Sequence, residues 1–186
     1  MPTIKPLSND YLIKLTYLLV IFTILSRLLP LSYNFTSLGA LSLFAGATLS
    51  IRIAWLMPCL ALLVTDAVSG FYNVTVMVFV YTGFMLCTLL GYFLLNHRKS
   101  LIRISVGSIM VAFIFYLVSN FGMWLSGLNY PMTLNGLLEC YIQGLPYLKV
   151  SLYADLIYSY FLFGIYALVA LYTQPTLPNH NRKTVL

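Results

Sequence analysis

Four long stretches without a charged residue constrain this sequence most: residues 28–51, 67–97, 104–138 and 156–181. A helix needs about 20 predominantly apolar residues to cross the hydrocarbon core of a bilayer, and each stretch is longer than that. Only 8% of the residues are charged and 61% are hydrophobic, whereas about a quarter of the residues of a soluble domain are charged. The chain is therefore predicted to be an integral membrane protein.

Turns and helix breakers divide the chain into six expected spans, which form a single membrane domain over residues 1–186. The expected spans are residues 11–29, 37–50, 53–67, 74–95, 104–125 and 151–172, followed by a tail over residues 173–186. The second and third spans are short, so they are expected to tilt little or to penetrate incompletely. Residues 133–145 are expected to form a re-entrant or capping helix before the last span. The fold class is an all-α, polytopic membrane protein.

The basic residues predict the orientation of these spans. With six spans, one side of the membrane collects Lys5, Lys14, Arg52, Arg98, Lys99, Arg103, Arg182 and Lys183. The other side keeps only Arg27 and Lys149. Because basic loops stay in the cytoplasm, both termini are expected there. The net charge of +6 thus reports topology, and no nucleic-acid partner is expected.

Small residues recur four apart on two of the expected helices. One stripe holds Ser42, Gly46 and Ser50, and the other holds Gly83, Cys87 and Gly91. Such stripes let a second helix approach closely, either within the chain or from a partner protein. The three cysteines have no spacing typical of metal ligands, so neither a disulfide framework, a metal site nor a cofactor is expected.

Polar groups are densest over residues 119–155, and other isolated polar residues are expected to lie on the same, outer side. The predicted substrate-binding residues are Arg27, Asn34, Phe35, Asp66, Asn120, Trp124, Tyr130, Glu139, Tyr141 and Asp155. All are expected at outer helix ends or in outer loops, with no ionisable group at mid-membrane. That distribution argues against a proton relay and favours a pocket open to the outside.

Several of these residues have two interpretations. The forked guanidinium of Arg27 suits a substrate carboxylate or phosphate, but it equally suits an ion pair with Asp66 or Asp155. Asn120 and Trp124 are four residues apart and share a helix face, where they suit ligand stacking or membrane-interface anchoring.

Glu139 lies on the expected capping segment, which is either a lid or an interfacial helix. His97 and His180 are expected on the cytoplasmic side, away from Asp66 and Asp155, so no Ser-His-Asp triad assembles and no enzyme is expected. An intramembrane enzyme that uses a carboxylate pair remains an alternative.

Three segments together resemble a family of small bacterial membrane proteins: SRLLPLSYNFTSLGALSLFAGATLS, VTDAVSGFYN and VSNFGMWLSGLNYPMTLNGLLECYIQGLPYLKVSLYADLIYS. That family is similar in size and six-helix plan to the substrate-binding S components of energy-coupling factor (ECF) transporters. The resemblance implies the bacterial inner membrane and a subunit that captures a small vitamin- or cofactor-like solute from outside. It also implies a transmembrane coupling subunit and ATPases as partners. A non-transport scaffold that binds another membrane protein is the alternative.

Overall fold

Every regular element in the described part of the chain is a helix. The computed structural model describes residues 9–28 and 35–173. Its elements are α1 (Asn9–Leu28), α2 (Leu38–Thr48), α3 (Ile51–Ala54), α4 (Leu56–Ser69), α5 (Val74–Leu95), α6 (Leu101–Leu125) and α7 (Leu134–Thr173). Five segments are long and apolar enough to cross a membrane, namely α1, α3 together with α4, α5, α6 and α7. The predicted all-α, multi-pass membrane fold is confirmed.

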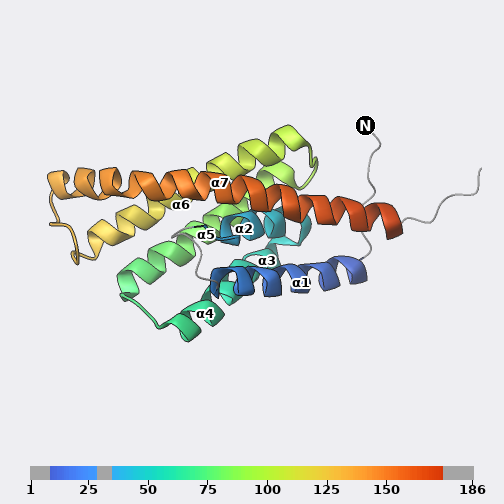
Figure 1. The fold of residues 1–186 in the computed structure, drawn as a ribbon, viewed down its shortest axis with the longest axis horizontal. Helices are drawn as coiled ribbons and strands as arrows, with labels where there is room; N and C mark the ends of the chain where they lie inside the picture. The colour runs from blue at the N-terminus through green and yellow to red at the C-terminus, as the bar shows by residue number, and fades with distance from the viewer. Residues whose placement is uncertain (1–8, 29–34, 174–186) are drawn as a thin grey trace, which may run out of the picture.

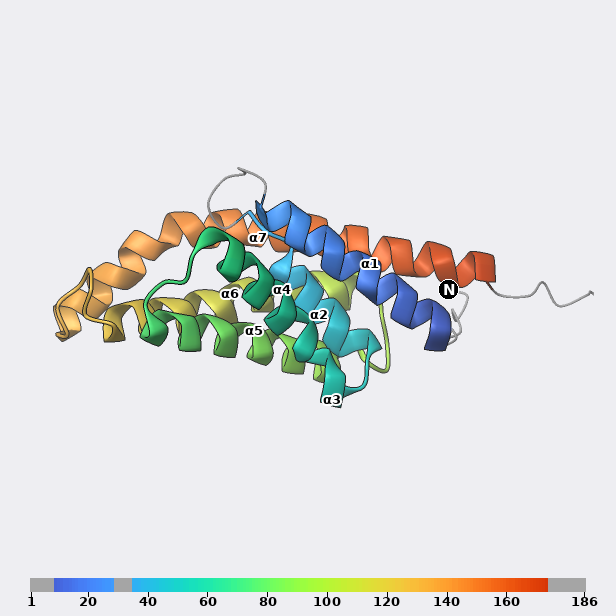
Figure 2. The ribbon, with the colours of Figure 1, turned by 90° about the horizontal axis from the view of Figure 1, so that it is seen from below.

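The short helix α2 lies at the centre of the bundle, and the other helices surround it (Figures 1 and 2). Residues 38–47 are all buried, as expected for a helix that is apolar around its whole circumference. Its 11 residues span about 16 Å, roughly half the thickness of the hydrocarbon core. One of the six expected spans is therefore a half-length helix enclosed by protein.

Glycines bring α2 and α5 into backbone contact. A Cβ on Gly46 would overlap the carbonyl oxygen of Thr88, and a Cβ on Gly91 would overlap that of Leu43. Close approach of this kind requires small residues. Of the six residues in the two predicted stripes, only Ser50 is exposed. The stripes are thus used for packing within the chain.

The structure corrects the predicted end of the chain. The expected capping segment and the expected last span form one continuous helix, α7, of 40 residues. Pro146 lies inside it, and α7 curves in this first half (Figure 2), because proline removes a backbone hydrogen bond. A helix of this length spans about 60 Å, twice the hydrocarbon core, so one part must project from the membrane.

The third predicted span is present but is longer and is interrupted. Residues 51–69 form α3 and α4, which are separated at Trp55. Pro58 is the third residue of α4, where its missing N–H costs no helical hydrogen bond.

The bundle has two different ends. The start of α1, the end of α7 and the α5–α6 connection lie towards one end, and the α6–α7 turn lies at the other (Figure 1). The first, here called the basic end, carries the exposed residues Lys14, Arg52, Arg98, Lys99 and Arg103. The second is called the far end.

Candidate functional site

Polar side chains from five segments follow one another across the bundle. This polar belt consists of Thr23, Ser26, Arg27, Ser37, Asp66, Tyr81, Asp155 and Ser159. It starts with an ion pair, because Nη2 of Arg27 lies 2.9 Å from Oδ1 of Asp66. The hydroxyl of Tyr81 donates a hydrogen bond of 3.2 Å to the other carboxylate oxygen. Helices α1, α4 and α5 are thereby joined around one buried carboxylate.

The two members of the ion pair differ in how far they are buried. The Asp66 side chain is 3% exposed and the Arg27 side chain 24%. Arg27 lies in the last turn of α1, where the helix dipole favours a cation. Burial, together with the charge of Asp66, raises the pKa of nearby Tyr72 to about 12, although Arg27 opposes the shift. Of the two predicted partners, Arg27 pairs with Asp66.

Two serines connect the ion pair to the start of α2. Ser26 immediately precedes Arg27 on α1, and its Oγ lies 2.8 Å from Oγ of Ser37. The Ser26 hydroxyl also lies 2.9 Å from the carbonyl oxygen of Thr23. Ser37 immediately precedes α2 and is fully buried, yet its side chain makes no capping hydrogen bond to that helix. The serine pair instead holds the end of α1 against the start of α2.

The carboxylate of Asp155 lies against the first turn of α2, where it interacts with the backbone N–H of Ala40. A Cβ on Gly39 would overlap Oδ1 of Asp155 and would lie 2.7 Å from a methyl group of Val111. Glycine is therefore required for α7, α6 and the start of α2 to meet at this point.

The position of Asp155 along its helix differs from the prediction. Asp155 and Val111 lie near the middle of α7 and α6 respectively, and Asp155 is only 5% exposed. The sequence analysis placed Asp155 at the start of a helix, whereas α7 begins 17 residues before the predicted span.

Two buried hydroxyls of the belt lack a partner among the described residues. Thr23 Oγ1 and Ser159 Oγ have no hydrogen-bond partner among the described residues, and both residues are 0% exposed. Ser159 lies one helical turn after Asp155 and shares its face. The rings of Phe22 and Tyr158, their sequence neighbours, are 6.0 Å apart. Buried hydroxyls are normally bonded, so an unpaired pair is typical of a place that receives a polar partner.

The other predicted site residues lie in a different region, the arm, defined as residues 116–145 at the far end. Here the hydroxyl of Tyr116 donates to the carbonyl of Tyr141 at 2.6 Å. The hydroxyl of Tyr141 donates back to the carbonyl of Leu117 at 2.8 Å. Cys140 Sγ lies 3.3 Å from the carbonyl oxygen of Asn120. These contacts fasten the end of α6 to the start of α7.

Trp124 and Asn120 also use their polar atoms on the backbone. The indole N–H of Trp124 lies 3.1 Å from the carbonyl oxygen of Pro131 and 3.2 Å from that of Thr133. The Asn120 amide donates to the carbonyl of Tyr116 at 2.8 Å. These bonds hold the α6–α7 turn and leave the two side chains little capacity for a ligand.

The remaining predicted residues divide between the two regions. Phe35 is half-buried, with its ring 5.6 Å from that of Tyr158 beside the belt. Tyr130 is half-buried and Glu139 exposed, both in the arm. Asn34 lies outside the described residues. The structure therefore brings Arg27, Phe35, Asp66 and Asp155 to the belt and leaves Asn120, Trp124, Tyr130, Glu139 and Tyr141 in the arm.

Sequence reasoning missed five belt residues: Thr23, Ser26, Ser37, Tyr81 and Ser159. Two of them carried a signal, because Ser26 adjoins Arg27 and Ser159 follows Asp155 at helical spacing. Tyr81 carried none, since its contact with Asp66 depends on how α4 and α5 pack.

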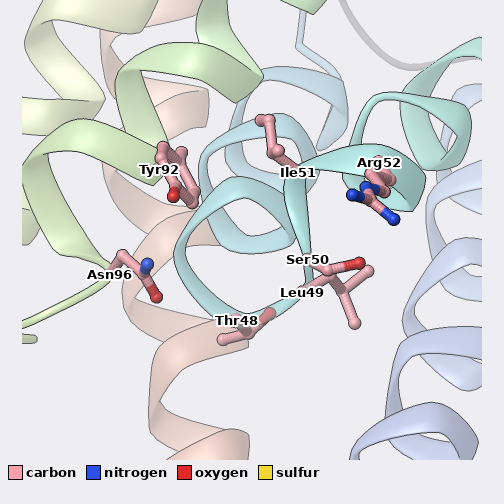
Figure 3. Close-up of a pocket in the computed structure, with 7 residues that line it drawn as sticks. All are labelled: Thr48, Leu49, Ser50, Ile51, Arg52, Tyr92 and Asn96. Atoms are coloured by element: carbon pink, nitrogen blue, oxygen red, sulfur yellow. The ribbon is translucent and has the colours of Figure 1, made fainter.

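An open hollow lies at the basic end, opposite to the expected outer pocket. It has a volume of about 540 Å³ and is lined by Thr48, Leu49, Ser50, Ile51, Arg52, Tyr92 and Asn96 (Figure 3). Its wall consists of the end of α2, the following turn, the start of α3 and the last turn of α5 with the residue after it. None of the predicted substrate-binding residues lines it.

Comparison with protein families agrees with the resemblance to an uncharacterised membrane family. The model of a family of unknown function (DUF6580) matches residues 8–177. The chain belongs to that family. Comparison of this DUF6580 chain with curated proteins and with solved structures found no match.

Proposed function

We propose that the protein is a solute-binding subunit of a membrane transport system, similar to an ECF S component, and that the polar belt holds the solute. One observation carries the proposal: α2 begins inside the bundle, with the Asp155 carboxylate against its first turn and the buried Ser37 immediately before it. In secondary transporters, half-helices that start near the midplane direct their N-terminal N–H groups at polar solutes.

The belt offers a small polar solute both donors and acceptors. The hydroxyls of Thr23 and Ser159 have no partner among the described residues, and Arg27 and Asp66 form a partly exposed ion pair in the same belt. Phe35 and Tyr158 add aromatic faces. This mixture suits a vitamin- or cofactor-like solute with several polar groups on an aromatic or apolar frame.

The proposed orientation has the basic end in the cytoplasm of a bacterial cell and the protein in the inner membrane. Five described cations lie towards that end, against Arg27 and Lys149 elsewhere, which is the bias of cytoplasmic loops. The solute would then enter from the far side, past the Arg27–Asp66 pair. A transmembrane coupling subunit with ATPases is the proposed source of energy, because S components work with such partners.

The scaffold alternative has less support. It relied on small-residue stripes available to another membrane protein, but Ser42, Gly46, Gly83, Cys87 and Gly91 are buried inside this chain. The basic end, with its hollow and its exposed cations, is the proposed contact with anionic lipid or with partners.

Mass spectrometry of small molecules that co-purify with the detergent-solubilised protein tests the proposal. We expect a solute in the wild type that is lost from Ser37→Ala, because that variant removes the hydroxyl between α1 and α2. The matched control is Ser119→Ala, which removes a hydroxyl bonded only to the carbonyl of Phe115 in the arm. Equal retention by both variants would contradict a solute site at the belt.

A further inference from the structure

Asp155 is buried inside the helix bundle and has no cation as a partner among the described residues. Two carboxylates are buried in the described helices, and only Asp66 has an ion-pair partner there. Removing an ionised carboxylate from water costs several kcal/mol even after the protein relaxes. One N–H from Ala40 and the dipole of an 11-residue helix offset only a part of that cost.

No other charged group faces Asp155 from the elements packed around it. Helix α2 has no titratable residue. From α5 the nearest titratable group is the Cys87 thiol, which donates to the carbonyl of Val111 at 3.6 Å. On α1, Arg27 is committed to Asp66 of α4.

The remaining titratable groups of α6 are elsewhere. Arg103 lies in the first turn of α6, and Tyr116 bonds to Tyr141 in the arm. On α7 itself, Tyr158 follows Asp155 by three residues, and its ring packs against those of Phe22 and Phe35. Because no described charged group neutralises Asp155, we expect a bound proton to do so.

We propose that Asp155 binds a proton inside the membrane and that its protonation lets an anionic group of the solute approach the start of α2. The neutral acid stays beside the first turn of α2, with the proton on one of its two oxygens. The N-terminus of a helix attracts anions through its free N–H groups and its dipole. Ionised Asp155 repels a second anion from that position, whereas neutral Asp155 does not. The part concerning the solute rests on the proposed function.

Infrared spectroscopy tests the proton without any solute. We expect the C=O band of a protonated carboxylic acid in the purified wild type at neutral pH, its loss in Asp155→Asn, and a shifted band in Asp155→Glu. The matched control is Asp66→Asn, which removes an ion-paired carboxylate and should keep the band. A wild-type spectrum without this band, or a band that survives in a helical Asp155→Asn variant, would overturn the proton site.

Thermal unfolding gives a second readout. A group that is protonated in the fold and ionised in the unfolded chain makes unfolding release a proton, so stability falls as pH rises. We expect the wild-type unfolding equilibrium constant to rise up to about tenfold per pH unit near neutral pH, and we expect that slope to disappear in Asp155→Asn. Stabilisation by sodium ions, with no pH slope, would overturn the proton in favour of a metal cation.

Formate, a small anion, probes the link to the belt. It should raise the melting temperature of the wild type more at acidic than at alkaline pH, and this difference should vanish in Asp155→Asn. If the infrared band is present but formate has no pH-dependent effect, the anion linkage is wrong and the proton site stands. Neither result depends on a solute that co-purifies, so both are distinguishable from failure of the proposed function.

Discussion

The polar belt and the arm use their polar side chains differently. In the arm, Tyr116, Tyr141 and Trp124 donate to backbone carbonyls, and each bond ties α6, α7 or their turn in place. In the belt, side chains contact other side chains, and two buried hydroxyls have no partner among the described residues.

This difference distinguishes polar groups that hold helices in position from polar groups that can bind a ligand. A polar group that is fully bonded to the backbone has little left for a ligand, and breaking its bond chiefly costs stability. A buried group with free capacity costs stability where it stands and is typical of a functional site. The densest polar stretch of the sequence is therefore mostly a helix–helix fastening, and the sparser belt is the candidate site.

The largest expected effect is the loss of one member of the belt ion pair. Arg27→Ala leaves the carboxylate of Asp66, 3% exposed, without its cation, and such changes typically cost about 3–5 kcal/mol. Thermal unfolding in detergent measures the loss. The double variant Arg27→Ala/Asp66→Asn should recover most of it. Wild-type stability in the single variant would show that the pair does not compensate a buried charge.

A methyl group at the junction of α2, α6 and α7 should have the next largest effect. Gly39→Ala forces a Cβ against the Asp155 carboxylate and Val111, which overpacks the site by about 1–3 kcal/mol and should release the solute.

The matched arm variant is Gly144→Ala, whose Cβ would lie 2.6 Å from the end of the Asn120 side chain. Because Asn120 is only half-buried, it can shift, so a smaller loss and normal solute retention are expected. If Gly144→Ala proved the more disruptive change, the contrast between the two regions would be incorrect.

A smaller effect is expected for one hydrogen bond of the arm. Tyr141→Phe removes the 2.8 Å bond to the carbonyl of Leu117, which is worth about 0.5–1.5 kcal/mol. The melting temperature should fall accordingly while solute retention stays unchanged. Loss of the solute with normal stability would assign Tyr141 to the binding site, as the sequence first indicated.

The smallest expected effect is electrostatic and appears only at high pH. The pKa of Tyr72 is raised to about 12 by burial and by the charge of Asp66. Because the unfolded tyrosine ionises at lower pH, its contribution to stability is complete below pH 10 and is lost as the pH rises towards 12.

Absorbance titration of the wild type against Tyr72→Phe measures this group directly. Asp66→Asn should lower the Tyr72 midpoint, because it removes a negative charge that disfavours the tyrosinate. An unchanged midpoint in Asp66→Asn would mean that Tyr72 does not sense the ion pair.

Most of the fold followed from the sequence, because runs of apolar residues decide where helices cross a membrane. The helices α1, α5 and α6 lie within three residues of their predicted bounds. The continuity of α7 did not follow, since the sequence analysis expected two separate helices there and a proline inside a helix, such as Pro146, removes a backbone hydrogen bond.

The candidate site was less accessible to sequence reasoning. Arg27, Asp66 and Asp155 were recognised as unusual charges in an apolar chain, but their depth and pairing depended on helix register. Serine and tyrosine occur throughout the chain, so the belt serines and Tyr81 do not stand out in the sequence. Only the three-dimensional arrangement distinguishes them from hydroxyls that bond to their own helix, such as that of Ser119.

The most direct test of the central claim compares two variants that each remove one tyrosine hydroxyl. Tyr81→Phe removes a hydrogen bond to Asp66 in the belt, and Tyr116→Phe removes one to the Tyr141 carbonyl in the arm. The amount of solute that co-purifies per protein should fall about tenfold in Tyr81→Phe, as expected for about 1.4 kcal/mol, and remain at the wild-type level in Tyr116→Phe. Retention by Tyr81→Phe with loss from Tyr116→Phe would place the site in the arm and contradict the account.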